Sequence, residues 1–409
     1  PPPDLQARRE RPYFIRPEPA AHCNDGDGFF TMSEGLSLRL SHKVTIMRQT
    51  TALPNELARD AAGPGFIGLA ERGLLPDALL RYGIRRQCRN RLRTELSGGV
   101  DAQAARFRVR IEQLRKSPVA IHTDAANAQH YELPPAFFEL SLGRRLKYSC
   151  AYYPRGDETL DQAEDAMLAL YGERAELADG QQILELGCGW GSLTLWMAER
   201  FPNARITAVS NSRPQREHIE AQCRVCGFDN VKVITCDVNR LRLDAAQFDR
   251  CLSIEMIELM RNYETLLGDI SEWLKPGGKL FVHIFVHRTL MYPFETEGKD
   301  NWMGRHFFTG GLMPASDTLL WFQRDLKIEQ RWHVDGTHYQ RTANHWLENQ
   351  DAARDQVMAV MREAYGESHA ALWFQRWRMF WMACAELFGY EDGNEWLVAH
   401  YRFNNKKPG

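Results

Sequence analysis

The stretch that decides the fold is Ile183-Leu184-Glu185-Leu186-Gly187-Cys188-Gly189-Trp190-Gly191. Its first four residues are mostly apolar and predict a buried strand, and three glycines follow at alternate positions. Glycine adopts backbone conformations that other residues avoid, so the strand can turn sharply into a helix and leave main-chain N–H groups open to a ligand. The stretch therefore predicts a strand–turn–helix unit that binds a nucleotide-type cofactor.

Three features around this turn favour S-adenosylmethionine over a dinucleotide. Glu185 lies two residues before the first glycine, where its carboxylate can meet the cationic amino group of the methionine part and would repel a diphosphate. The next predicted strand, residues 204–209, ends in neutral Ser210-Asn211-Ser212, where a dinucleotide-binding fold usually has an acid for the ribose. A third predicted strand, residues 231–235, places Asp237 where it can accept a hydrogen bond from the adenine amino group. The alternative role for Asp237 is a helix cap.

The 409 residues are enough for two domains or for one decorated domain. Residues 1–45 are rich in proline and glycine and predict an extended tail, which we expect a partner protein to hold. Apolar residues at helical spacing predict a helical appendage over residues 46–118. Predicted strands and helices then alternate, which indicates an α/β fold with a doubly wound, mostly parallel sheet. This domain, residues 119–404, would carry C-terminal helical insertions that cover the substrate.

Charge and composition exclude several functions. The formal net charge of −2 provides no global basic field for nucleic acid. A local exception is residues 81–93, with six arginines, from Arg81 to Arg93; such a helix is usually solvated, and the alternative is contact with anionic lipid or an acidic protein. No apolar run approaches the length that spans a bilayer. Nine scattered cysteines predict a reducing, intracellular location, cytoplasmic or organellar, with the mitochondrial matrix included, and no metal site is expected.

Candidate chemical groups follow the later strands. Glu255 and Glu258 come after the predicted strand at residue 248, and His283 ends the strand that begins at Lys279. Carboxyl ends of strands in an open α/β sheet face the ligand, so these groups would meet there and bind a cation or a proton. The alternative for the two acids is a solvated loop. An aromatic stripe predicts core packing or, alternatively, a pocket for a flat cation: Trp373, Trp377, Trp381, Phe380 and Phe388.

Several motifs resemble the cyclopropane fatty acid synthase superfamily of S-adenosylmethionine-dependent methyltransferases, and most of all its coclaurine-type N-methyltransferases. They include Tyr148-Ser149-Cys150-Ala151-Tyr152, the glycine turn, Ser210-Asn211-Ser212 with Gln215, and Phe307-Phe308-Thr309-Gly310-Gly311. The likeness spans about residues 80–404 and implies a Rossmann-like class I methyltransferase fold. The implied activity is methyl transfer to the nitrogen of a small-molecule amine. Two alternatives stay open: a lipid methyltransferase like cyclopropane-fatty-acyl-phospholipid synthase, acting on an unsaturated acyl lipid, and a catalytically weakened subunit of a larger assembly.

The resemblance also implies roles for individual residues. Cofactor contacts are expected at Tyr148, Ser149, Glu185, Gly187, Gly189, Gly191, Ser210, Asn211, Ser212, Gln215, Asp237 and Val238. Glu255 and Glu258 match two acids that orient the amine and assist its deprotonation. The positions that hold bicarbonate in the cyclopropane synthases correspond to Cys150, Glu258, His283 and Tyr339. Leu259 stands where most of the superfamily has histidine, which implies slower or retuned catalysis.

Overall fold

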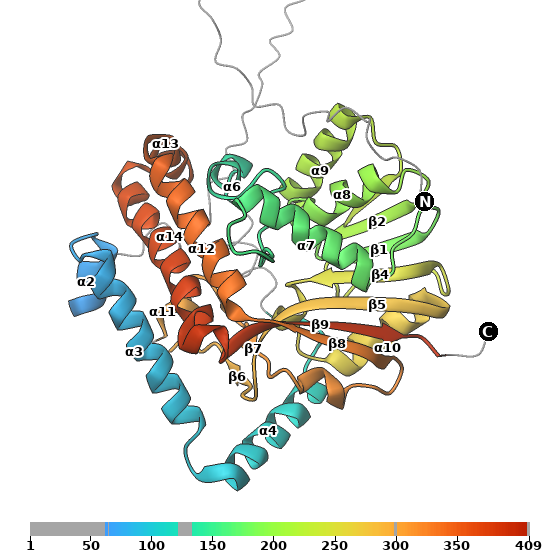
Figure 1. Ribbon diagram of the computed structural model, residues 1–409, viewed down its shortest axis with the longest axis horizontal. Coiled ribbons are helices and arrows are strands. Elements are labelled where there is room, and N and C mark those ends of the chain that lie inside the picture. Colours follow the sequence, from blue (N-terminus) through green and yellow to red (C-terminus); the bar gives the residue numbers. More distant parts are fainter. Residues whose placement is uncertain (1–61, 64, 122–132, 298–300, 407–409) are drawn as a thin grey trace, which may run out of the picture. The chain divides into compact units, whose positions relative to one another are not determined.

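A computed structural model describes residues 62–63, 65–121, 133–297 and 301–406. The predicted tail, residues 1–45, lies outside these ranges. The described chain contains a seven-stranded sheet with helices on both faces (Figure 1). Among the described helices, none has both the length and the apolar character needed to cross a membrane.

The strand order confirms the predicted doubly wound sheet. It is β3-β2-β1-β4-β5-β9-β8, and every neighbouring pair is parallel except the two that involve β9. The reversed strand β9, late in the chain, therefore lies between β5 and the edge strand β8. The bounds are β1 (Gln182–Leu186), β2 (Arg205–Ser210), β3 (Val231–Thr235), β4 (Phe248–Ile254), β5 (Leu274–His287), β8 (Lys327–Val334) and β9 (Trp396–Asn404).

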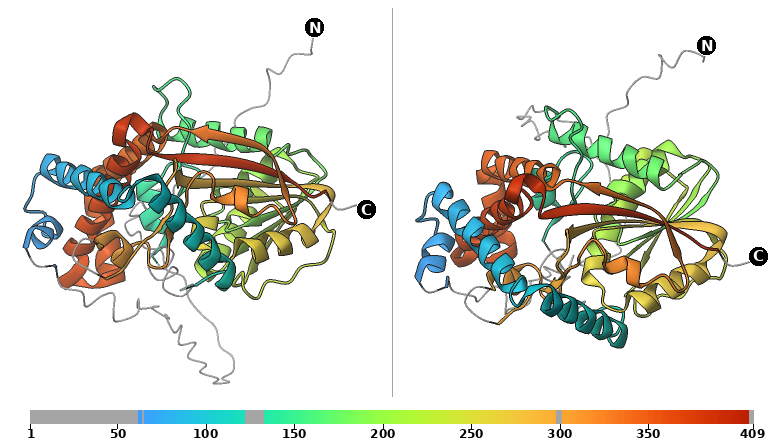
Figure 2. Two further views of the ribbon diagram at one scale, coloured as in Figure 1. Left: turned by 90° about the horizontal axis from the view of Figure 1, so that it is seen from below. Right: turned by 60° about the horizontal axis from the view of Figure 1, so that its bottom comes forward.

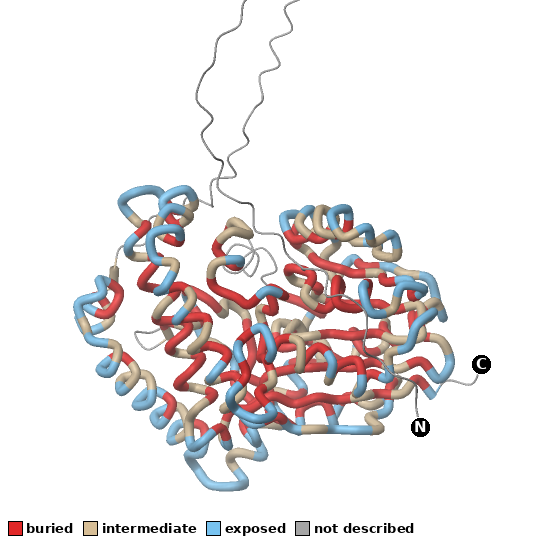
Figure 3. Tube along the Cα trace, turned by 45° about the horizontal axis from the view of Figure 1, so that its top comes forward, coloured by how far each residue is buried: buried red, intermediate tan, exposed pale blue. Residues whose placement is uncertain are grey.

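Helices cover the two faces of this sheet, as Figure 2 shows. On one face lie α7 (Leu160–Arg174), α8 (Ser192–Arg200) and α9 (Arg213–Cys226), and α10 (Tyr263–Trp273) lies on the other. The central strands are apolar along almost their whole length because both faces are covered, and Figure 3 shows them buried. The core thus fixes the strand ends, where the site is built.

A second group of helices lies beyond the carboxyl ends of the strands. It comprises α6 (Pro135–Ser141), α12 (Gly336–Ala352), α13 (Arg354–Tyr365) and α14 (Glu367–Phe388), and α14 packs against α3 (Asp77–Glu95) (Figure 1). The helix α4 (Gly99–Lys116) follows α3 and contacts α10. Shorter elements are α2 (Gly65–Glu71), α11 (Trp302–His306), β6 (Tyr292–Pro293), β7 (Leu312–Met313) and the 3₁₀ turns Ile257–Leu259, Thr318–Trp321 and Tyr390–Gly393. The domain boundaries proposed above stay a prediction.

A buried ion pair joins the first of these helices to the last. Glu71 of α2 and Arg376 of α14 are each 1% exposed, and Arg376 Nε lies 2.9 Å from Glu71 Oε1. Trp302 Nε1 of α11 donates to the same oxygen over 2.9 Å. One carboxylate therefore connects three elements, α2, α11 and α14.

Candidate active site

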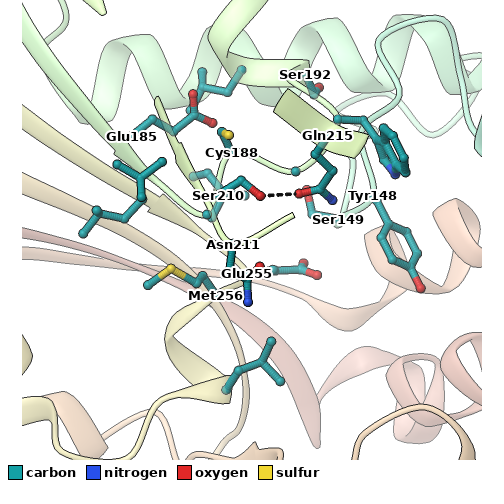
Figure 4. A pocket seen from close by; sticks show the side chains of 18 of the residues that line it. Tyr148, Ser149, Glu185, Cys188, Ser192, Ser210, Asn211, Gln215, Glu255 and Met256 are labelled. Atoms are coloured by element: carbon teal, nitrogen blue, oxygen red, sulfur yellow. Dashed lines mark hydrogen bonds between the residues drawn. The ribbon is translucent and has the colours of Figure 1, made fainter. Parts of the chain in front are cut away.

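A cavity of about 1180 Å³, including its open mouth, lies at the carboxyl ends of β1, β2 and β4 (Figure 4). Ten of the predicted cofactor contacts line it: Tyr148, Ser149, Glu185, Gly187, Gly189, Ser210, Asn211, Gln215, Asp237 and Val238. The other two are close by but serve the backbone, since Gly191 is the N-cap of α8 and Ser212 caps α9 through Gln215 N. The structure thus gathers these residues from four separate segments into one wall.

The glycine turn opens the backbone toward this cavity. Gly187, Gly189 and Gly191 have φ values of +79°, +53° and +85°, which favour glycine. A Cβ on Gly187 would lie 2.8 Å from Met256 Cβ, so this position also permits close packing. A Cβ on Gly189 would meet nothing within 4 Å. The free space above Gly189 is where a ligand can reach the main chain.

Some buried polar atoms in the cavity wall make no hydrogen bond within the described part of the chain. Ser210 Oγ donates to Gln215 Oε1 over 2.7 Å, whereas the buried Gln215 Nε2 and Ser192 Oγ have no hydrogen-bond partner among the described residues. Glu185 is 2% exposed, and burial raises its pKa to about 8 although Thr194 donates to it over 2.5 Å. Buried donors without a partner suit the polar oxygens of a ligand, and a buried acid whose hydrogen-bond donor is a neutral hydroxyl suits a cationic amino group. The wall therefore fits S-adenosylmethionine.

Asp237 stabilises the turn that follows β3. Its Oδ1 accepts from Asn239 N over 2.8 Å and from Asn239 Nδ2 over 3.0 Å. Because Asp237 also lines the cavity after β3, the predicted contact with adenine is compatible with this turn.

A second cavity, about 740 Å³ with its mouth, adjoins the first. Tyr148, Glu255 and Leu259 line both cavities, so these residues form the boundary between them. Aromatic rings make most of the remaining wall: Phe285, Phe294, Phe308, Tyr339, Trp346, Phe380 and Phe388. A largely apolar cavity beside a cofactor site is the usual arrangement for a small-molecule substrate.

Glu255 is held firmly at this boundary. Cys150 N donates to Oε1 over 3.0 Å, His283 Nε2 lies 3.0 Å from the same oxygen, and Tyr339 OH donates to Oε2 over 2.6 Å. The Glu255 backbone has φ +45°, a conformation that costs a non-glycine residue about 1 kcal/mol. Burial raises the Glu255 pKa, and the nearby Lys147 ammonium opposes that rise.

Glu258 lies in contrasting surroundings. It is 2% exposed and lines the second cavity, and its Oε2 has no hydrogen-bond partner in the described structure. Burial, followed by the charge of Glu255, raises the Glu258 pKa well above its ordinary value. A carboxyl that has one oxygen without a partner and a raised pKa is a candidate proton acceptor in a cavity.

Two predicted site residues act from behind the cavities. His283 does not end its strand as predicted, because pairing with β9 extends β5 to His287. His283 is fully buried, contacts Glu255 and lines neither cavity described above. Cys150 contributes its backbone N–H, while its thiol points to Ala151 O at 3.2 Å. Both therefore orient Glu255.

Some residues of the aromatic stripe pack in the core, and others line the second cavity. Trp373, Trp377 and Trp381 are buried in the packing of α14 and line neither of the two cavities. Trp381 Nε1 donates to Gln350 Oε1 over 2.6 Å, which fixes its ring in the helical layer. Phe380 and Phe388 face the second cavity.

The sequence interpretation missed Lys147. This residue is 2% exposed, and its Nζ donates to Ser149 Oγ over 2.5 Å and to Cys150 O over 2.6 Å. Burial lowers its pKa to about 8. Its position beside Tyr148-Ser149-Cys150 was the one available signal, because nothing in the local spacing predicts that a lysine is buried.

Nowhere in the described chain do three or more metal-ligating side chains cluster.

Comparison with known proteins agrees with this geometry. Residues 120–396 match the family model described as mycolic acid cyclopropane synthetase. (S)-Coclaurine N-methyltransferase of Thalictrum flavum subsp. glaucum is 36% identical over 340 residues, which cover 82% of this chain and 94% of the relative. The crystal structure of coclaurine N-methyltransferase bound to N-methylheliamine and SAH is similar with a TM-score of 0.79 and 37% identity, covering 82% of this chain and 97% of that one.

More distant relatives share the same architecture. Cyclopropane-fatty-acyl-phospholipid synthase of Escherichia coli (strain K12) is 28% identical over 277 residues, 67% of each protein. A cyclopropane synthase from Mycobacterium tuberculosis, 20% identical, has the same fold with a TM-score of 0.60, covering 70% of this chain and all of that one. The chain therefore belongs to the mycolic acid cyclopropane synthetase family, and its fold and cofactor cavity are those of a class I S-adenosylmethionine-dependent methyltransferase.

Proposed function

We propose that this protein transfers a methyl group from S-adenosylmethionine to the nitrogen of a small-molecule amine. The observation that carries the proposal is the second cavity, where aromatic walls enclose two carboxylates next to the cofactor cavity. Aromatic faces and acids together attract an organic cation or an amine. The relatives named coclaurine N-methyltransferase support this substrate class over the lipid and subunit alternatives.

The cofactor supplies a methyl group that is already activated by a positively charged sulfur. Gln215, Ser192 and Glu185 would hold it through the unsatisfied groups described above. The aromatic walls exclude water, and Glu255 places a negative charge where the nitrogen becomes cationic. Glu258 takes up the proton that the amine must lose. Leu259 provides no imidazole for this step, so we assign proton uptake to Glu258.

Bicarbonate is not needed in this scheme. The resemblance to cyclopropane synthases implied that Cys150, His283 and Tyr339 hold that anion, but here all three engage the Glu255 carboxylate. We propose that Glu255 supplies the anion from the protein itself. Methyl transfer should then proceed equally well in buffers freed of bicarbonate, whereas a lipid methyltransferase of the cyclopropane type would lose activity.

The test begins with S-adenosylmethionine binding by calorimetry, followed by methyl transfer to a panel of secondary and tertiary amines and to unsaturated phospholipid vesicles. We expect binding and turnover on amines. Glu258→Gln should lower kcat by roughly 10²- to 10⁴-fold and leave cofactor binding unchanged. Glu164→Gln is the matched control, since Glu164 is an equally buried acid with a pKa raised to about 8 but lines neither cavity. Turnover on vesicles alone, or cofactor binding without any transfer, would overturn the proposal.

Peripheral contacts are a separate proposal. Arg81 and Arg85 of the arginine run bind Glu386 of α14 over 2.8 and 2.5 Å, so part of the run serves the fold. Arg86, Arg89 and Arg93 are exposed on α3. Contact of these three with anionic lipid or an acidic protein is tested by sedimentation with anionic vesicles and by cross-linking. A protein partner for residues 1–45 and an intracellular location, cytoplasmic or organellar, likewise stay predictions.

A further inference from the structure

A row of buried side chains continues behind Glu255. His283 of β5 and His400 of β9 stand opposite each other in the antiparallel pair, with His283 Nδ1 2.9 Å from His400 Nε2. Arg174, the last residue of α7, places Nη1 2.6 Å from His400 Nδ1. Both imidazoles are fully buried. An unbroken line of hydrogen bonds thus runs from Arg174 through two histidines to the Glu255 carboxylate.

Arg174 sets the direction of this line. A guanidinium group can only donate, so His400 Nδ1 must accept and the His400 proton must sit on Nε2. His400 then donates to His283 Nδ1, which leaves the His283 proton on Nε2, directed at Glu255 Oε1. Burial lowers the pKa of both histidines well below the ordinary value, so each ring carries a single proton. All three donors therefore point toward Glu255.

We propose that His400 and Arg174 are positioning residues for methyl transfer, which fix the tautomer of His283 and so keep Glu255 an oriented anion between the two cavities. The proposal rests on the proposed function, because an anion at this place matters when a cationic nitrogen forms. The row does not conduct protons outward, since Arg174 keeps its proton at its end of the line. Tyr171 OH also lies 2.9 Å from His283 Nδ1 and shares the single lone pair of that nitrogen with His400.

Other groups also face Glu255 and must be held constant in any test of its ionisation. They come from the segment after α6, from α7, from the turn after β4, from β5 and from the α12 and α14 helices: Lys147, Cys150, Tyr171, Glu258, His283, Tyr339 and Cys384. His400 and Arg174 touch Glu255 only through His283. Substitutions there consequently change the donor and leave this surrounding set in place.

Two substitutions of His400 separate positioning from packing. The glutamine in His400→Gln can accept from Arg174 and donate to His283, whereas the leucine in His400→Leu can do neither. We expect His400→Leu to lower kcat roughly ten- to a hundredfold, as for loss of a hydrogen bond to a charged group, with the KM for S-adenosylmethionine unchanged. In this variant the acid limb of the pH dependence of kcat should move to higher pH, because a weaker donor raises the Glu255 pKa. His400→Gln should retain most of the rate. His287→Leu is the matched control, a buried histidine on β5 that contacts Glu395 and not Glu255.

Arg174→Met gives an independent arm if His400→Leu fails to fold. It should lower kcat and shift the acid limb in the same direction, because His400 is then free to change tautomer. Arg200→Met is its control, since Arg200 ends the helix α8 and lies over the Trp196 ring, just as Arg174 ends α7 and lies over Trp332. Equal losses in the test and control variants, or unshifted pH profiles, would overturn the proposal.

A readout without turnover distinguishes this proposal from the proposed function. Nitrogen NMR of histidine-labelled protein should report Nε2–H tautomers at both His283 and His400, and Arg174→Met should change the His400 signals. An Nδ1–H tautomer at His283 would refute the positioning role even in an active enzyme. If the native protein methylates no amine yet shows the expected tautomers, the proposed function fails while the assigned direction of the hydrogen bonds stands.

Discussion

Glu255 and Glu258 are three residues apart, yet their environments give them different tasks. Three donors hold Glu255, whereas Glu258 Oε2 has no partner within the described ranges. The donors favour the charged form of Glu255 against the effect of its burial, whereas burial raises the pKa of Glu258 and makes its ionised form a stronger base. This separation of two neighbouring acids is a pattern that supports acid–base chemistry near neutral pH.

At the same scale, Glu185 should make cofactor binding depend on pH. Its pKa of about 8 in the ligand-free protein means that it is largely protonated at pH 7, and the cationic amino group of the cofactor favours its ionised form. Affinity for S-adenosylmethionine should therefore rise with pH up to about 8, by at most about tenfold per unit, with release of a proton. Calorimetry in two buffers of different ionisation enthalpy measures both quantities. Glu185→Gln should bind more weakly with a flat profile; an unchanged slope in this variant would contradict the assignment.

Leu259 offers a gain-of-function test. It lines both cavities next to Glu258 in sequence, so Leu259→His places an imidazole with an ordinary pKa near 6.5 beside the reacting nitrogen. We expect a faster rate with secondary amines, which must lose a proton, and a smaller effect with tertiary amines, which have none to lose. Rates over a pH series check this prediction. Leu259→Gln controls for added polarity, and equal effects on both amine classes would argue against proton uptake here.

At the scale of elements, a substitution in the glycine turn should affect cofactor binding more than it affects stability. Gly189→Ala adds a methyl group that meets no protein atom within 4 Å, so its cost should be the strain of a positive φ, about 1–2 kcal/mol. That methyl group would occupy the space of the cofactor, and binding should fall by an order of magnitude or more. Gly180→Ala, with φ +81° and open surroundings before β1, is the control for strain. Calorimetry measures the cofactor affinity of both variants, and thermal unfolding measures their stability. Equal affinity in the two variants would show that the cofactor does not bind above Gly189.

Element types were largely predictable from sequence, but strand ends were not. The apolar run before Gly187 and the alternation after residue 160 predicted the parallel strands, because both follow local spacing. The prediction that His283 ends its strand was wrong. The reversed strand β9, over a hundred residues later, extends β5 to His287 and buries that side chain. Such pairing depends on distant chain segments and leaves no local signal.

At the scale of the whole molecule, Glu71 connects the N-terminal helices to the substrate side. Glu71→Gln should lower the free energy of unfolding by about 3–5 kcal/mol, because it leaves the buried Arg376 charge uncompensated. Glu386→Gln is the control, since its arginine partners are 23% and 46% exposed and an exposed pair contributes about 1 kcal/mol or less. Denaturant unfolding measures both. A Glu71 variant as stable as the Glu386 variant would show that the pair contributes little.

The site as a whole could be predicted only in part. Motifs close in sequence named most of the cofactor wall and the two acids. The buried Lys147, the aromatic wall from α12 and α14, and the support of Glu255 by His400 arise where segments far apart in the chain meet. These depend on tertiary packing, which the sequence encodes only through the complete fold.

The placement of β9 has a consequence for how the protein is made. This strand lies between β5 and β8, both of which leave the ribosome earlier, and it carries His400. A nascent chain can form β1 to β5 with the cofactor wall, but β8 has no neighbour until residues 396–404 emerge and insert. Until then His283 lacks its contact with His400. The row of hydrogen bonds from Arg174 to Glu255 is thus completed only when residues 396–404 have been translated.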